Sequence, residues 1–388
     1  MERHHEFRGL KYFSFGQTMS YGMIALTYLY HLSKKEKRIA WETILNKEKT
    51  EFGITEEFKK IIPKELETFL FSKELDETHS HRIIQTPPEH FQALSDPTRQ
   101  NIIFTVWETD YLPDEWKPIL AGSDKIIVPC QWNKRVFEEG GVKRPISVIP
   151  HISEFHGVES DFCGPIPKDV FVFLNVSVWE KRKNLEQLIE AFVKAFPGKK
   201  DVMLVLKTSP KDIGKYFIDF WKFRKYLLTP LRTILLKLKF HGLKSQIMVI
   251  PENVSSKYMQ YLYSRADAYV SLSHAEGFGM GIYESGFYGK PVIATNYGAY
   301  LDFLDQENSF LINCRLGQMT PNPWDRKNMQ GHFWAFPDLN HAIDLMRYVY
   351  FYPSKSKERG KKLKTRVEKD FVTEKITEKF LNFINEPC

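Results

Sequence analysis

Cysteine is scarce in this sequence, which has four among its 388 residues. They are Cys130, Cys163, Cys314 and Cys388, and no two of them have the C-x-x-C spacing. Scattered cysteines fit a reducing compartment and argue against a disulfide framework and against a zinc site. We therefore expect a protein that needs neither a metal ion nor another bound cofactor.

Long hydrophobic runs are also missing. The apolar stretch over residues 21–32 is too short to cross a bilayer, and no signal-peptide cleavage site follows it. We therefore expect a cytoplasmic protein, with attachment to the cytosolic face of a membrane as an open alternative. Hydrophobic residues make up 43% of the chain and charged residues 27%, a balance that predicts a globular protein long enough for two domains.

Acidic residues are too few to balance the basic ones, and the formal net charge is +7. Residues 211–244 hold nine lysines and arginines against two aspartates. Aromatic and aliphatic residues are interleaved with these charges, which is typical of amphipathic helices that lie on an anionic membrane. A helical insertion packed on its own domain accounts for the same composition equally well.

The most informative stretch is 268–295. Its pattern predicts an apolar strand over 268–271, a glycine loop over 274–279, a short helix over 280–288 and a second strand over 292–295. Loops at the carboxyl ends of strands are where open α/β sheets bind ligands. Gly277 and Gly279 allow close approach of the backbone, and the N–H groups at the start of the helix favour an anion.

Two acids flank this predicted anion site, Glu276 in the loop and Glu284 in the helix. They are compatible with an anionic ligand if they face its uncharged hydroxyls, as a sugar and a ribose would supply. An ordinary βα turn with a solvated glutamate is the alternative. The two acids, with Gly-Phe-Gly between them and Gly289-Lys-Pro-Val-Ile-Ala-Thr295 after them, resemble the E-x7-E signature of the family 4 retaining glycosyltransferases.

A second cationic loop precedes this stretch. Residues 180–184, Glu-Lys-Arg-Lys-Asn, separate a predicted strand over 169–177 from a helix that begins at Asn184 with a capping-box pattern to Gln187. Three consecutive cations at a helix N-terminus are repelled by the helix dipole, so a bound anion would relieve the conflict. A solvated basic turn is the alternative.

This loop resembles the diphosphate-binding loop of the same family. The resemblance makes Lys183 the phosphate-binding lysine, with Arg182 beside it. Where relatives have a second basic residue at the end of the preceding strand, this chain has Val178. We therefore expect either that Arg182 or Lys181 takes its place or that activity is reduced.

The resemblance extends to other parts of the donor site. The donor-binding residues that it implies are Gly277, Phe278, Gly279, Met280, Glu284, Lys207, Gly22 and Gly298. Lys207 follows a predicted strand over 202–206, and Gly298 lies in the loop after the strand over 292–295. Gly22 belongs to a glycine loop after the apolar run 10–15, where a plain helix start is an equal alternative.

The first half of the chain predicts a parallel sheet. Strands are expected over 81–86, 101–106 and 125–129, with helical patterns between them, and residues 34–73 are expected to be helical. Titratable residues that follow these strands are candidates for acceptor contact or proton transfer. They are Glu108, Asp110, Glu89 and His90, and for each of them a solvated loop charge is the alternative.

The resemblance implies an α/β protein of the GT-B type, with two Rossmann-like domains that face each other across a cleft. The expected boundaries are 1–152 for the acceptor-side domain, 153–167 for a linker, 168–360 for the nucleotide-sugar domain and 361–388 for a helix that packs back across the domain boundary. We expect nucleotide sugar and acceptor as partners, and no nucleic acid.

The implied activity is transfer of a hexosyl-type sugar from a GDP- or UDP-sugar to a glycan, lipid-linked or protein acceptor, with retention of anomeric configuration. Glu276, Lys183 and Arg182 are the expected catalytic residues, and the two cations make a metal unnecessary. A hydrolase with paired carboxylates is a rival that this spacing suits less well. A nucleotide-sugar-binding protein with little or no turnover is a second alternative, which Val178 keeps open.

Overall fold

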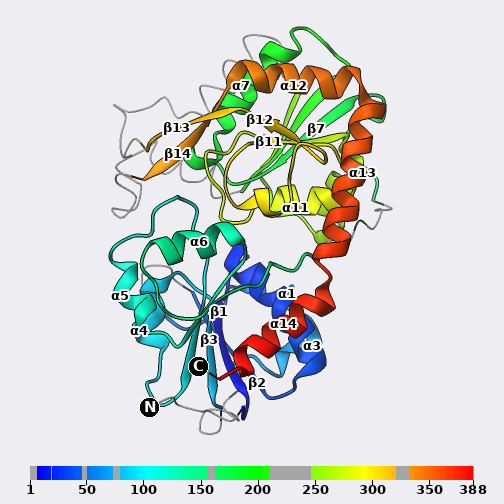
Figure 1. The fold of residues 1–388 in the computed structure, drawn as a ribbon. Coiled ribbons are helices and arrows are strands. Elements are labelled where there is room, and N and C mark those ends of the chain that lie inside the picture. The colour runs from blue at the N-terminus through cyan, green and yellow to red at the C-terminus, as the bar shows by residue number, and fades with distance from the viewer. Residues whose placement is uncertain are drawn as a thin grey trace, which may run out of the picture. The chain divides into compact units, whose positions relative to one another are not determined.

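The chain forms two compact α/β units, each built on a six-stranded sheet (Figure 1). The computed structural model describes all residues except 1–6, 19, 46–49, 73–78, 155–156, 158–161, 210–245, 320–331 and 388. The first unit comprises Met1–Glu154, Met319–His332 and Phe371–Cys388, and the second comprises Phe155–Gln318 and Phe333–Asp370.

The first sheet is parallel throughout and has the strand order β2-β1-β3-β4-β5-β6. Its strands are β1 (Leu10–Phe15), β2 (Ile39–Ile44), β3 (His81–Ile84), β4 (Gln100–Phe104), β5 (Lys125–Val128) and β6 (Ile146–Val148). Every residue of β1 and β4 is buried, as is typical of parallel strands that are covered on both faces. The buried Lys11 of β1 is paired with Glu42 of β2 at 2.6 Å.

The helices of the first unit are short apart from α1 and α14 (Figure 1). They are α1 (Ser20–Lys35), α2 (Glu56–Lys59), α3 (Lys64–Glu67), η1 (Pro88–His90), α4 (Phe91–Leu94), α5 (Trp116–Ala121), α6 (Gln131–Glu139) and α14 (Thr373–Asn385). Large aromatic side chains fill the core, among them the fully buried Trp107 and Trp116, whose ring centroids are 4.5 Å apart.

The expectation of helix over residues 34–73 is wrong, because the strand β2 lies within it. The stretch is rich in lysine and glutamate before and after the strand, and that composition favoured helix. The strand itself places Ile39, Ala40 and Trp41 in the core beside Leu10, Lys11 and Tyr12 of β1. Burial beside a neighbouring strand therefore overrides the local helix propensity.

The second sheet is also parallel and has the order β12-β11-β10-β7-β8-β9. Its strands are β7 (Phe171–Val176), β8 (Val202–Lys207), β9 (Ile247–Ile250), β10 (Ala268–Ser271), β11 (Val292–Thr295) and β12 (Phe310–Ile312). The strands expected over 169–177, 202–206, 268–271 and 292–295 are confirmed by β7, β8, β10 and β11. The chain runs outward from β7 to β8 and later returns to place β10 on its other side, so the strand order reverses at β7. Ligands of open α/β sheets bind at such a reversal point, at the carboxyl ends of the strands.

Helices and a hairpin surround the second sheet. They are η2 (Lys181–Lys183), α7 (Leu185–Ala195), α10 (Ser256–Arg265), α11 (Met280–Phe287), η4 (Ala299–Asp302), α12 (Leu339–Phe351) and α13 (Pro353–Asp370), with the antiparallel pair β13 (Cys314–Gln318) and β14 (Phe333–Pro337). Apolar residues of α7 and α12, such as Phe192 and Met346, pack with Phe173 and Leu204 of the strands in one buried cluster. This cluster holds the strand ends, and therefore the loops that follow them, in place.

The C-terminal region 361–388 holds parts of two helices rather than the one helix expected there. Helix α13 ends at Asp370, and α14 begins at Thr373 after two non-helical residues. Phe371 is buried, and Val372 has an extended backbone. Helix α13 belongs to the second unit and α14 to the first, so the chain changes units at this break.

Candidate functional site

Two loops of the second unit lie side by side at the reversal point. One follows β7 and contains η2, and the other follows β10 and leads to α11. The N–H of His274 donates to the carbonyl oxygen of Arg182 at 2.8 Å, which joins the loops directly. The cationic loop and the glycine loop therefore form one site, although Lys183 and Glu276 are 93 residues apart in sequence.

Glu276 is the centre of this site. Its side chain is 9% exposed, and Lys183 Nζ lies 2.7 Å from both of its carboxylate oxygens. Arg182 Nη1 lies 3.2 Å from Glu276 Oε2, and the hydroxyl of Ser273 donates to Oε1 at 2.8 Å. The three residues expected to be catalytic are thus in direct contact, with Ser273 as a fourth member.

Opposing effects act on the ionisation of Glu276. Burial favours the neutral carboxyl, but the positive charges of Lys183 and Arg182 and the hydrogen bonds outweigh burial, so the pKa of Glu276 is lowered. The carboxylate is therefore ionised at neutral pH. Arg182 Nη2 also lies 3.7 Å from the carboxylate of the exposed Glu180, so Lys183 and Arg182 together contact two carboxylates.

Asn184 ties the two loops together instead of capping α7. The expected capping box is wrong, because Asn184 has a left-handed backbone (φ 53°) and makes no side-chain cap. Its amide Nδ2 donates to Gln187 Oε1 at 2.6 Å and to the carbonyl oxygen of Leu272 at 3.1 Å. The side chain is committed to the neighbouring loop rather than to the first turn of its own helix.

The glycine loop has the backbone that its sequence requires. Gly279 (φ 84°) is the N-cap of α11, and Gly298 (φ 97°), next to the backbone of Glu276, has a left-handed conformation that favours glycine. Phe278 is buried among Tyr283 and Phe303, with ring centroids 5.2 and 5.8 Å away. The phenylalanine side chain therefore anchors the loop in the domain core.

Glu284 lies in the second turn of α11 and is held by a tyrosine. The hydroxyl of Tyr263, on α10, donates to Glu284 Oε2 at 2.5 Å. Two other residues of this unit that were expected to bind the donor substrate lie elsewhere. Met280 is half-buried at the start of α11, and Lys207 ends β8 and donates to the carbonyl oxygen of Thr208.

Gly22 is in the first unit and lies inside the first turn of α1 rather than in the loop before it. An added Cβ would lie 2.7 Å from the carbonyl oxygen of Phe15 and would also meet that of Gln17. A glycine is therefore required for the tight passage from β1 into α1.

The acceptor-side candidates follow strands of the first unit. The indole N–H of Trp116 donates to Glu89 Oε1 at 3.2 Å, while the buried His90 has Nδ1 3.1 Å from the hydroxyl of Thr50. Glu108 and Asp110 flank Thr109, whose hydroxyl lies 2.7 Å from His332 Nδ1. The structure thus groups these candidates in two pairs, each with a buried histidine.

Sequence reasoning missed His274, which joins three segments. Its Nδ1 lies 2.7 Å from the carbonyl oxygen of Ala335, so Nδ1 carries the proton, and its own carbonyl accepts from the Ala335 N–H at 3.1 Å. Its ring stacks on Trp334 with centroids 5.3 Å apart. Burial lowers the pKa of His274, so the imidazole is neutral at neutral pH. Only the fold could reveal this contact, because β14 is about 60 residues further along the chain.

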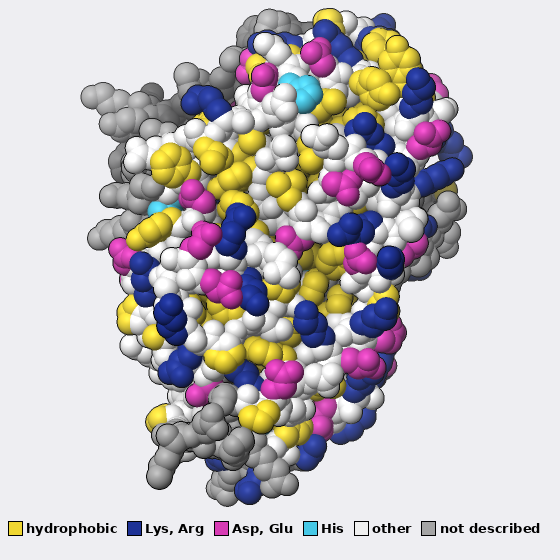
Figure 2. Space-filling view, viewed as in Figure 1, with side chains coloured by type: hydrophobic (Ala, Val, Ile, Leu, Met, Phe, Trp, Pro, Cys, Tyr) yellow, Lys and Arg dark blue, Asp and Glu magenta, His cyan; other side chains and the backbone are white. Residues whose placement is uncertain are grey.

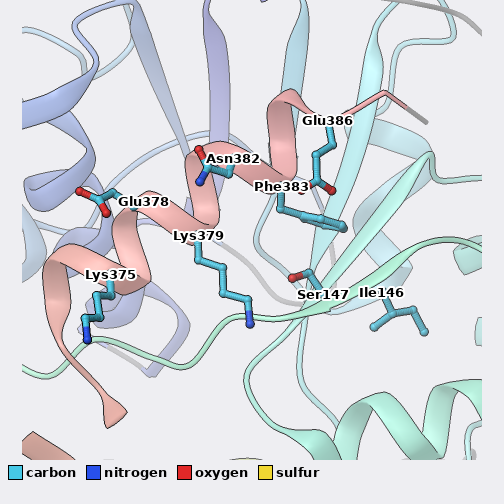
Figure 3. A pocket seen from close by; sticks show the side chains of 8 residues that line it. All are labelled: Ile146, Ser147, Lys375, Glu378, Lys379, Asn382, Phe383 and Glu386. Carbon is cyan, nitrogen blue, oxygen red and sulfur yellow. The ribbon is translucent and has the colours of Figure 1, made fainter. Parts of the chain in front are cut away.

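A surface hollow of about 520 Å³ in the first unit involves none of these residues (Figure 3). Helix α14 contributes Lys379 and Phe383 to its wall, and β6 contributes Ile146 and Ser147. On the face drawn in Figure 2, basic and acidic side chains are interspersed over the described residues rather than gathered by sign. Neither feature indicates a site that competes with the one around Glu276.

Two further searches concern the described part of the chain. No group of three or more histidine, cysteine, aspartate or glutamate side chains there has the arrangement of a metal site. None of its helices has both the length and the apolar character that a membrane span requires. The basic segment 211–244 lies outside the described residues.

Residues 159–315 match the family described as Glycosyl transferases group 1. The match covers both loops of the site, including Lys183, Glu276 and Glu284. It does not distinguish family 4 from other families of this group.

Two relatives match shorter stretches. The trehalose synthase of Pyrococcus horikoshii is 30% identical over 121 residues, which are 31% of this chain and 23% of that protein. ORF313 of Acidianus filamentous virus 1 is 40% identical over 99 residues, which are 24% of this chain and 28% of that protein. The matched regions thus span about a quarter of each relative.

Solved structures share the fold of the whole chain. HepE from Anabaena, crystallised with UDP and glucose, has a TM-score of 0.67 at 13% identity, covering 97% of this chain and 99% of HepE. Sucrose-phosphate synthase from Thermosynechococcus elongatus has a TM-score of 0.65 at 15% identity, with coverage of 97% and 98%. The architecture is therefore that of GT-B proteins, with two Rossmann-like domains.

Proposed function

We propose that this protein is a retaining glycosyltransferase that moves a hexosyl group from a UDP- or GDP-sugar to an acceptor. The observation that carries the proposal is the ionised Glu276, held by Lys183 and Arg182 at the reversal point of the second sheet. The HepE structures, one of them a complex with UDP-glucose, support a uridine nucleotide as the first donor to test.

Each residue of the site has a proposed role. Lys183 and Arg182 bind the diphosphate and stabilise the negative charge that develops on it as the glycosidic bond breaks. Glu276 accepts hydrogen bonds from sugar hydroxyls, and Glu284 accepts them from the ribose. Lys207, Gly298 and the backbone from Gly277 to Met280 line the nucleotide, and Gly22 of the first unit is a further residue proposed to bind the donor.

Metal independence is part of the proposal. In many phosphate-transferring sites a divalent cation neutralises the diphosphate, but here Lys183 and Arg182 can supply that charge from within the chain. Their ammonium and guanidinium groups are fixed by Glu276 before any ligand arrives, so little reorganisation is needed.

The acceptor remains a broader proposal. A glycan, lipid-linked or protein acceptor would contact Glu108, Asp110, Glu89 or His90 in the first unit, with one of them as proton acceptor.

We further propose a cytoplasmic enzyme that segment 211–244 brings to anionic membranes. Sedimentation with phosphatidylserine vesicles at low salt tests this, and protein that stays in the supernatant would exclude it.

The function is tested with the full chain, a panel of UDP- and GDP-sugars, and glycan or lipid acceptors. Release of nucleoside diphosphate with formation of a glycoside that keeps the donor's anomeric configuration is the expected result. Binding of the donor without release or transfer would favour the alternative of a nucleotide-sugar-binding protein. That alternative is motivated by Val178, a 37% exposed aliphatic side chain where relatives have a basic residue.

A further inference from the structure

Glu284 has a fixed hydrogen-bond donor in Tyr263. The phenol lies 2.5 Å from Glu284 Oε2 and the tyrosine is 0% exposed. Its ring stacks on Tyr288, with centroids 5.6 Å apart and planes 18° from parallel. The phenol cannot turn away without breaking this packing, so it holds one carboxylate oxygen in a single position.

Tyr263 is the donor and Glu284 the acceptor in this hydrogen bond. Burial, and next the charge of Glu284, raise the pKa of Tyr263 well above its ordinary value, so the phenol stays protonated. A phenol that donates to a carboxylate makes a short, charge-assisted hydrogen bond. Helix α10 precedes β10 in the chain and α11 follows the loop after it, so the bond also joins the two helices that flank β10 in sequence.

We propose that Tyr263 is a positioning residue that orients Glu284 toward the ribose of the donor and thereby makes the site select ribonucleotides over 2′-deoxyribonucleotides. This inference rests on the proposed function, in which Glu284 accepts hydrogen bonds from the ribose. A carboxylate has about four lone-pair positions, and the bond from Tyr263 occupies one of them.

Selectivity for ribonucleotides follows because a missing hydrogen bond to the carboxylate costs binding free energy. A carboxylate that is held rigidly toward a hydroxyl loses a charge-assisted partner when the hydroxyl is absent, and it cannot turn to find another. Loss of the Tyr263 phenol removes this constraint on the carboxylate and opens the vacated position to water. Removal of the phenol should therefore weaken ribonucleotide binding more than deoxyribonucleotide binding.

Tyr288 supplies a matched control. Its hydroxyl is buried and has no hydrogen-bond partner among the described residues, although its ring packs directly on Tyr263. Tyr288→Phe therefore removes a buried hydroxyl from the same aromatic pair without touching the bond to Glu284. A general effect of altered packing would appear in both variants, whereas an effect on orientation would appear in Tyr263→Phe alone.

The test is calorimetric titration of the full chain with UDP and 2′-deoxy-UDP, and with GDP and 2′-deoxy-GDP. We expect the wild-type protein to prefer the ribonucleotide about ten-fold or more, as expected for a lost hydrogen bond to a charged group. Tyr263→Phe should reduce this ratio at least about three-fold with little change in deoxyribonucleotide affinity, and Tyr288→Phe should keep it.

Three results would overturn the inference. A folded Tyr263→Phe protein that keeps the full ratio would show that the phenol does not orient Glu284. Equal affinity of the wild-type protein for ribonucleotides and 2′-deoxyribonucleotides would show that the site does not select ribose. If Tyr263→Phe does not fold, Glu284→Gln replaces it, and an unchanged ratio in that variant has the same consequence. Wild-type protein that binds none of the four nucleotides would instead overturn the proposed function.

Discussion

Replacing Lys183 by methionine is the most direct test of how the site is built. Lys183 and Glu276 are 15% and 9% exposed at their side chains, and Nζ contacts both carboxylate oxygens at 2.7 Å. Removing one member of a buried ion pair typically costs about 3–5 kcal/mol, because it leaves the other charge uncompensated. Arg182 and Ser273 still contact Glu276, so we expect about 2–3 kcal/mol, below that range.

The double variant measures the interaction between Lys183 and Glu276 separately from the effect of each single substitution. When Glu276→Gln is added to Lys183→Met, no unpaired carboxylate remains, and part of the lost stability should return. We expect a coupling free energy of about 1–3 kcal/mol in the cycle of four proteins, measured by urea unfolding of each. Additive effects of the two substitutions would refute the inferred ion pair.

The pH dependence supplies a second measurement on the same proteins. The folded-state pKa of Glu276 lies below its ordinary value of 4.5, so its contribution to stability is present above about pH 4.5 and is lost as pH falls through the lowered folded-state pKa. Glu276→Gln should therefore make the free energy of unfolding less sensitive to acid over this window. An unchanged acid dependence would contradict the lowered pKa.

Three further predictions use the same protein. Glu276→Gln, which keeps the shape of the side chain, should lower the rate of transfer by about 100-fold or more while the donor still binds, and near-normal turnover would exclude its role. Transfer should continue in excess EDTA, and a loss that magnesium restores would refute metal independence. Lys125→Met should destabilise the protein by about 1.5–3 kcal/mol and speed hydrogen exchange in α14, because the buried Lys125 donates to the Phe383 carbonyl oxygen at 2.7 Å and to those of Ile384 and Glu386. Unchanged exchange in α14 would contradict that last expectation.

Local sequence patterns predicted the strands and helices whose apolar pattern lies within a single stretch of the chain. The strand, glycine loop, helix and strand over 268–295 were all readable from the sequence, because burial on both faces gives parallel strands an unbroken apolar run. The strand β2 was not readable, since its buried residues are flanked by charged ones that favour helix. Short strands such as β12, with three residues, give too little pattern to recognise.

In the candidate site, the sequence likewise predicted single residues but not the contacts between them. Glu276 and Lys183 could be named because each lies in a motif of its own, but their mutual contact across 93 residues could not be derived from either motif. Tyr263 was passed over for a related reason, since a tyrosine in an amphipathic helix is usually a core residue. Its bond to Glu284 exists only because the fold brings α10 and α11 into contact with each other. Contacts of this kind depend on topology, which no single stretch of sequence contains.

The two acids of the E-x7-E motif have different partners, and the difference matches their proposed ligands. Glu276 is held by Lys183 and Arg182, the two cations that we propose bind the diphosphate. Glu284 accepts a hydrogen bond from the neutral phenol of Tyr263, which adds no positive charge beside the carboxylate. A lysine in place of Tyr263 would instead put a cation beside Glu284. One motif can therefore serve both a charged and an uncharged part of one ligand because the rest of the domain supplies a different donor to each acid.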